Sequence, residues 1–184
     1  KKKEDSNSKR KKEKNKKKER NQKAMKEKQA KVEQERMRQK AIEEQERSRL
    51  QGKIHIMSQH LKNNTSPAQY SLSGIELSEN TTLVLCNDVK FNKTLKSLHL
   101  SKKKLRDSQG VKIAQMLADN TCILKLELEG NFLGPKSALE FGKVLKDKNK
   151  TLRYLDLENN YLTDSGATYD EVKSFSDCLL TNKT

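Results

Sequence analysis

The 184-residue chain contains no tryptophan, two prolines and three cysteines, and aromatic residues make up 4% of it. The cysteines Cys86, Cys122 and Cys178 are far apart, form no Cys-x-x-Cys pair and have no histidine at metal-ligand spacing. We therefore expect reduced, buried thiols that act as small hydrophobic side chains. No apolar stretch approaches the roughly 20 residues that a membrane span needs, and the segment that starts at Lys1 has no signal-peptide pattern.

Motifs for catalysis or cofactor binding are also missing from the sequence. It has no Gly-rich phosphate loop and no His-Glu-x-x-His, and its three histidines, His55, His60 and His99, are not clustered. Asn-x-Thr triplets occur at five positions, but three of them recur at one place in the repeat described below, which explains them without glycosylation. We expect no enzyme activity, no cofactor and no metal.

Charge is present in excess and is unevenly distributed. The chain has 40 Lys+Arg against 25 Asp+Glu, a net charge of +15. Residues 1–60 contain 22 Lys or Arg and 10 Asp or Glu, which gives them +12, whereas the remaining residues carry +3. An asymmetry of this size predicts a basic arm that is attached to a folded module.

The arm divides into two segments by composition. Residues 1–21 are Lys-rich and of low complexity, and residues 22–62 are predicted to form a charged helix because strong helix formers fill them. Its apolar residues are too sparse for a sustained heptad seam, which favours a single solvated helix over a coiled coil. The end of the helix carries an apolar face that we expect to dock on the following module, formed by Leu50, Ile54, Met57 and Leu61.

A leucine pattern repeats along the second half of the chain. It consists of three sets of four residues: Leu95, Leu98, Leu100 and Leu105, then Ile123, Leu126, Leu128 and Leu133, then Leu152, Leu155, Leu157 and Leu162. Within each set, successive residues are three, two and five positions apart. The sets begin 28 and 29 residues apart, and an asparagine precedes each one. A fixed period of this size indicates a repeat protein.

Each repeat is predicted to contain one short strand and one helix. Leucines of the strand point inward, and the second half of the repeat has apolar residues at helical spacing, as at Val111, Ile113, Met116 and Leu117. Neither half can be buried by one repeat alone, so neighbouring repeats must stack. Because strands lie about 4.8 Å apart and helices roughly 8–10 Å apart, we predict an α/β solenoid with parallel strands on its concave face and helices on its convex face.

These residues resemble the ribonuclease-inhibitor-like class of leucine-rich repeats. Residues 152–167, LRYLDLENNYLTDSGA, are close to the consensus of that class, and the resemblance covers about residues 67–184. It implies a degenerate repeat or cap at 67–94 and leucine-rich repeats at 95–184, with further repeats in the full protein. Two departures stand out: Lys103 occupies an asparagine position, so we expect that turn to be closed differently, and an insertion is expected around 169–173.

The predicted concave face offers a candidate partner-binding strip. Tyr154 and Leu124 are candidate anchors, and stacking is expected to place a basic edge of Lys96, Lys125 and Arg153 beside an acidic column. The outward residues are Lys96, Ser97, His99 and Ser101, then Leu124, Lys125, Glu127 and Glu129, then Arg153, Tyr154, Asp156 and Glu158. An ordinary solvated sheet face explains the same residues equally well.

The basic arm concentrates enough charge to attract an anionic polymer. The polymer could be nucleic acid, an anionic membrane surface or the acidic tails of tubulin, and the lack of aromatic residues in the first 60 positions disfavours single-stranded nucleic acid. The basic residues are Lys9, Arg10, Lys11, Lys12, Lys16, Lys17, Lys18 and Arg20.

The combination of a long charged helix with this repeat class resembles leucine-rich-repeat subunits of the ciliary axoneme. That resemblance implies a non-catalytic scaffold in the cytoplasm that docks protein partners and anchors to an acidic assembly, such as axonemal microtubules. Two alternatives stay open: a cytosolic regulatory or actin-associated binding module, and a nuclear protein whose arm contacts nucleic acid. Fold does not fix function.

Overall fold

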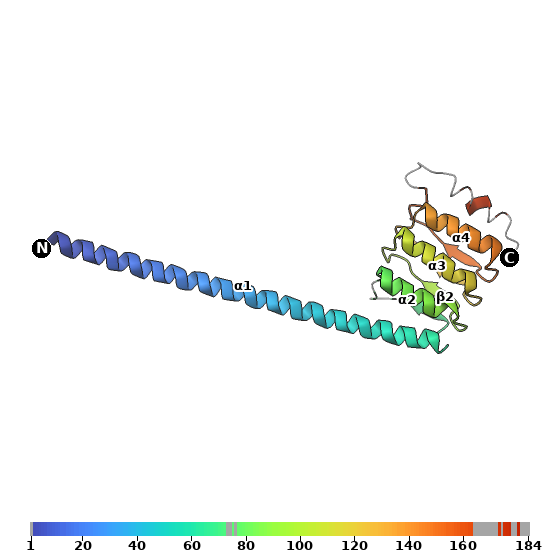
Figure 1. The fold of residues 1–184 in the computed structure, drawn as a ribbon, viewed down its shortest axis with the longest axis horizontal. Coiled ribbons are helices and arrows are strands. Elements are labelled where there is room, and N and C mark those ends of the chain that lie inside the picture. The colour runs from blue at the N-terminus through green and yellow to red at the C-terminus, as the bar shows by residue number, and fades with distance from the viewer. Residues whose placement is uncertain are drawn as a thin grey trace. The chain divides into compact units, whose positions relative to one another are not determined.

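In the computed structural model, the named elements of the described residues are four parallel strands and four helices (Figure 1). The structure describes residues 2–72, 75, 77–163, 173, 175–177 and 180, with side chains from residue 14 onward except 15, 17 and 19. Two compact units are present, Lys1–Arg49 and Leu50–Thr184. In order, the elements are α1 (Lys2–Lys62), β1 (Gln69–Ser71), α2 (Glu79–Lys90), β2 (Ser97–His99), α3 (Asp107–Asp119), β3 (Lys125–Glu127), α4 (Pro135–Asp147) and β4 (Tyr154–Asp156).

The first unit is helical, because it belongs to α1 throughout its described length. The helix includes residues 2–21 as well as the segment 22–62 in which the sequence predicts it, since neither part contains proline. The described side chains up to Arg49 are all exposed, so this part of α1 gains little from packing. Within the described residues, no helix is long and apolar enough to cross a membrane.

The second unit is built on a parallel sheet with the strand order β1-β2-β3-β4. Tyr70, Leu98, Leu126 and Leu155 lie at the same level of successive strands, so the register follows the leucine offsets of the sequence. The α/β character and the parallel strands are therefore confirmed. The segment 67–94 supplies β1 and α2, which makes it a strand–helix unit of the same kind as those that follow.

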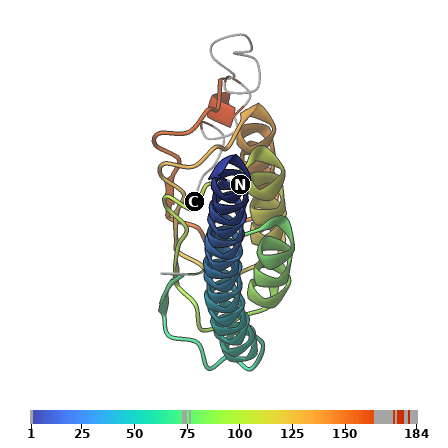
Figure 2. The same cartoon turned by 90° about the vertical axis from the view of Figure 1, so that its left-hand side faces the viewer.

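Helices α2, α3 and α4 lie side by side on one face of the sheet, so that sheet and helices form two layers (Figure 2). Leucines of the strands and apolar residues of the helices meet between the layers in one core, which includes Leu98, Leu126, Ile113 and Phe141. Helices α3 and α4 come close at Gly110, where an added Cβ would lie 2.1 Å from Ser137 Oγ. Stacking of the repeats thus buries both halves of each one.

The end of α1 contributes to this core. Met57 and Leu61 are 0% and 1% exposed, and Leu50 and Ile54 pack partly buried against the same cluster. The apolar face predicted from the sequence therefore packs within the core of the second unit, to which it belongs. Asn64 follows in the left-handed conformation at φ 54°, and Thr65 N donates to His60 O at 2.9 Å, which ends the helix.

Two asparagine ladders join neighbouring repeats. The first ladder is formed by Asn92, Asn120 and Asn149. The amide nitrogens of Asn120 and Asn149 donate to carbonyls of the preceding repeat, and that of Asn92 donates to Leu61 O in α1. Each amide oxygen accepts backbone N–H groups two and three residues onward. All three side chains are buried. The Asn-x-Thr triplets at Asn92 and Asn149 therefore have a structural role.

The second ladder closes the turns after the strands. Asn131 and Asn160 donate to carbonyls of the preceding and the same repeat, for example from Asn131 Nδ2 to Leu100 O at 2.9 Å. Lys103 stands at the equivalent position, and its Nζ donates to Leu72 O at 2.6 Å and Ile75 O at 3.4 Å. The turn is therefore closed differently, as expected, and the structure adds that the ammonium group of Lys103 takes the place of the amide. Burial lowers the pKa of Lys103.

Candidate protein-binding face

The face of the sheet that points away from the helices carries polar and charged side chains in columns across the strands. We call it the open sheet face and define its columns by equivalent positions in successive repeats. They are Lys96, Leu124 and Arg153; then Ser97, Lys125 and Tyr154; then His99, Glu127 and Asp156; and last Ser101, Glu129 and Glu158.

The register changes one detail of the predicted strip. Lys125 pairs with Ser97 and Tyr154, not with Lys96 and Arg153, so the basic edge is interrupted by Leu124. The expectation placed Lys125 one position too early because it followed charge and not the leucine offset. Ser97, which was expected to point outward, is 6% exposed. The acidic residues, expected in one column, occupy two: Glu127 with Asp156, and Glu129 with Glu158.

Three side chains form a charged network in the middle of this face. Glu127 accepts from Lys125 Nζ at 2.5 Å and also contacts His99 Nδ1. The hydrogen bond from Lys125, and then that from His99, lowers the pKa of Glu127, and the same bond raises the pKa of Lys125. Glu127 is therefore ionised at neutral pH and is held in place by both neighbours.

Leu124 and Tyr154 are large apolar side chains on an otherwise polar face. Leu124 is 43% exposed and Tyr154 is 48% exposed. Lys125 Nζ lies over the Tyr154 ring at 4.9 Å from its centroid, which is cation–π geometry. The ring and the ammonium group thus hold each other beside Glu127, and the ring remains available to a partner.

A depression of about 550 Å³ crosses the strands next to the charged network. Its lining is polar, with Glu127, Glu129 and Asp156 against His99 and Lys103. Carboxylates in such a depression suit a basic side chain of a protein partner. Among the described residues, no group of three or more His, Cys, Asp or Glu is placed to hold a metal ion.

The basic residues of the arm belong to α1 and not to the open sheet face. Lys16, Lys18 and Arg20 are exposed. Lys9, Arg10, Lys11, Lys12 and Lys17 lie on the same helix, and their side chains are outside the described part. Cys86 and Cys122 are free and buried, which confirms the expectation for these two thiols, whereas Cys178 falls outside the described residues.

Sequence reasoning missed the cross-strand contacts of the open sheet face. It named His99, Lys125 and Glu127 separately but did not bring them together. The repeat offsets contain the needed signal, because His99 and Glu127 are both one position after the strand leucine. The placement of Lys125 Nζ over the Tyr154 ring depends on side-chain rotamers, which the pattern does not encode.

Comparison with known proteins identifies the repeat. The family model described as Leucine Rich repeat matches residues 148–169. Residues 148–169 thus match a leucine-rich repeat. A solved structure titled "Leiomodin-1 Actin-Binding Site 2 (ABS2)" is similar to this chain, with a TM-score of 0.60, 22% sequence identity, and coverage of 68% of this chain and 71% of that one. At this identity the likeness shows a leucine-rich-repeat type of fold, and the comparison with curated proteins finds no significant match.

Proposed function

We propose that this leucine-rich-repeat chain is a non-catalytic interaction module that docks a cytoskeletal protein, with actin as the first candidate. The observation that carries the proposal is the open sheet face, where the exposed side chains of Leu124 and Tyr154 lie two to three residues before Glu127 and Asp156, two of the carboxylates that line the depression. Protein interfaces commonly combine an aromatic anchor with surrounding charged groups. The similar solved structure is named for an actin-binding site, which supports actin over other partners.

The test is co-sedimentation of the full chain with actin filaments. Tyr154→Ala should weaken binding by about tenfold, since a central aromatic anchor typically contributes more than 1 kcal/mol. Phe91→Ala is the matched control, because Phe91 is also an exposed aromatic residue with a lysine, Lys90, over its ring at 5.2 Å. Equal binding by the parent and Tyr154→Ala, or equal loss in both variants, would reject the open sheet face as the docking site.

A second candidate is anchoring to microtubules through the first unit. The observation in its favour is α1, whose described side chains up to Arg49 are all exposed. In the sequence, residues 1–49 contain 21 Lys or Arg against 10 Asp or Glu. Such a helix can lie along the acidic tails of tubulin. Microtubule anchoring would fit a subunit of the ciliary axoneme whose repeats are of the ribonuclease-inhibitor-like class. We retain both the axonemal location and the repeat class as proposals.

The two candidates separate in one sedimentation series. The full chain is mixed with intact microtubules, tail-cleaved microtubules or actin filaments, at about 50 and about 150 mM salt, with duplex DNA as competitor. Sedimentation with intact microtubules alone supports the axonemal candidate. Sedimentation with actin that depends on Tyr154 supports the first proposal, and equal competition by DNA would favour the nuclear alternative.

A further inference from the structure

A second candidate binding site lies where the chain passes from strand to helix. A pocket of about 740 Å³ is lined by Lys102, Lys103, Lys104 and Arg106 together with Ile75, which precedes α2, and Glu79, at the start of α2. We call it the basic pocket. Four cationic side chains within five consecutive positions meet there. Lys103 closes the turn of its repeat, whereas the repeat pattern does not require the charges of Lys104 and Arg106.

The backbone of this turn is held in an unfavourable conformation. Lys102 and Lys104 both have positive φ, 57° and 56°. At the position of Lys102 the next repeats have Gly130 and Asn159, which also have positive φ and adopt this region more readily. Lysine side chains are therefore kept where glycine or asparagine fits better, and unfavourable backbone of this kind concentrates at functional sites.

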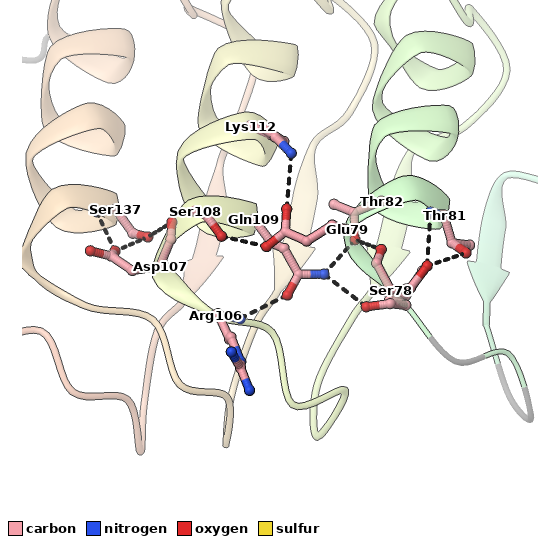
Figure 3. Close-up of polar contacts among 11 residues, drawn as sticks. Ser78, Glu79, Thr81, Thr82, Arg106, Asp107, Ser108, Gln109, Lys112 and Ser137 are labelled. Atoms are coloured by element: carbon pink, nitrogen blue, oxygen red, sulfur yellow. Dashed lines mark hydrogen bonds and ion pairs between the residues drawn. The ribbon is translucent and has the colours of Figure 1, made fainter.

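The cations of the turn differ in how far they are already engaged. Lys103 donates to backbone carbonyls, and Lys102 pairs with Glu129 at 3.2 Å. Within the part of the chain that the structure describes, Lys104 and Arg106 are exposed and have no ion-pair partner. Figure 3 shows the Arg106 guanidinium directed away from the polar contacts at the helix N-termini, which Arg106 joins through its backbone N–H to Gln109 Oε1 at 2.9 Å.

An aromatic pair adjoins the turn. The rings of Phe132 and Tyr161 stack with their centroids 5.9 Å apart, and the two side chains are 48% and 59% exposed. Phe132 N donates to Leu105 O at 2.8 Å, and Phe132 forms a parallel bridge with Arg106. The exposed aromatic surface therefore begins beside Lys104 and Arg106. Cations next to an exposed aromatic pair form the kind of surface that provides binding hot spots.

We propose that the basic pocket and the Phe132–Tyr161 pair dock an acidic peptide segment of a protein partner. Carboxylates of the segment bind Lys104 and Arg106, and one of its apolar side chains packs against the aromatic pair. Glu79 and Glu129 flank the cations, which disfavours the continuous phosphates of a nucleic acid and suits a peptide with a few separated carboxylates. The site borders the open sheet face, with which it shares Lys103 and the Lys102–Glu129 ion pair, but it extends to different residues and does not rest on the proposed function.

The test is an NMR titration of the full ¹⁵N-labelled chain with a short peptide of glutamates around one phenylalanine. Residue-resolved shifts are needed because the basic arm also attracts acidic peptides, and arm binding moves different amides. Saturable shifts are expected at residues 102–106 and at Phe132 and Tyr161. The Kd fitted at these residues should rise about tenfold in Lys104→Glu/Arg106→Glu and in Phe132→Ala.

The matched control is Lys143→Glu/Lys146→Glu, which makes the same charge change on exposed residues of α4. It should leave the Kd at residues 102–106 unchanged, and thermal melts show whether every variant is folded. Retained binding in the two target variants would overturn the proposal. So would an equal loss in the control, or displacement of the peptide by a lower concentration of single-stranded RNA.

Discussion

Asn120 joins three successive repeats through a single buried amide. Its Nδ2 donates to Val89 O at 2.7 Å and Asn92 O at 3.3 Å, and its Oδ1 accepts from Cys122 N and Ile123 N at 2.9 and 2.8 Å. Asn120→Ala leaves these buried groups without partners, and each such group costs about 1–3 kcal/mol. We expect the free energy of unfolding in urea to fall by about 3 kcal/mol.

Asn21→Ala is the control for this effect, because it makes the same change on the exposed part of α1. It should alter the free energy of unfolding of the second unit by less than about 0.5 kcal/mol. A similarly small effect of Asn120→Ala would show that water replaces the amide and that the ladder is not a main source of stability.

Cys86 tests burial through the chemistry of its thiol. Its side chain lies in the core, and desolvation raises the pKa of Cys86 from 9.0 to about 12. Between pH 9.0 and about 12, the folded protein keeps the thiol proton that the unfolded chain releases. The stability gained by burying the neutral thiol is therefore fully present below pH 9.0 and is lost as the pH rises toward 12. At pH near 8, we expect iodoacetamide to modify Cys86 at least about a hundredfold more slowly in the folded protein than in urea. Peptide mass spectrometry measures both rates, and equal rates would contradict the burial.

At the scale of elements, the leucine offsets predicted most of the second unit. Because each strand places Leu98, Leu126 or Leu155 at the same level, a repeat of 28 or 29 residues defines the sheet register as well as the strands. The helices followed from apolar spacing. The prediction succeeded for a physical reason. The strands and the helices must both bury apolar residues in the core between them, and few sequence patterns allow this.

Contacts between the ends of elements could not be predicted in this way. Asp107, at the start of α3, accepts from Gly134 N and Ser137 N at 2.9 and 2.8 Å and so binds the N-terminus of α4 (Figure 3). Lys103 replaces an amide through a long side chain that reaches the previous repeat. Both contacts depend on how repeats are placed in three dimensions, and leucine spacing carries no information about the rotamers involved.

The spacing of α3 and α4 depends on Gly110. An added Cβ would lie 2.1 Å from Ser137 Oγ and 2.8 Å from Leu133 Cδ2, so these side chains or the helices must shift. We expect Gly110→Ala to lower the free energy of unfolding by about 1–3 kcal/mol, as overpacking does, despite the better helix propensity of alanine.

Gly52→Ala is the matched comparison, because Gly52 also lies in a helix but has nothing within 4 Å of an added Cβ. It should raise the free energy of unfolding by about 0.5–1 kcal/mol. Urea unfolding of both variants decides the matter, and a stabilising Gly110→Ala would mean that α3 and α4 can separate at little cost.

For the second unit as a whole, stability depends on its first stacked layer. The layer is the end of α1, where Met57 and Leu61 are buried and Lys62 pairs with Asp88 at 3.4 Å. In stacked repeats each unit is stabilised by its neighbours, so uncovering α2 exposes apolar surface and weakens the units beyond it. The second unit therefore begins at Leu50, although the leucine pattern itself starts further along the chain.

This dependence predicts how truncation and substitution act. The fragment 50–184 should keep the melting temperature of the full chain, whereas 66–184, which lacks the buried end of α1, should melt lower or fail to fold. In the full chain, Met57→Ala should lower the free energy of unfolding by about 2–5 kcal/mol because it opens a cavity, while Met25→Ala, at a residue 62% exposed, should change it by less than about 0.5 kcal/mol. Circular dichroism melts and urea unfolding measure these effects. If 66–184 melts with the full chain, the repeats are stable without this layer, and α1 serves the attachment of partners alone.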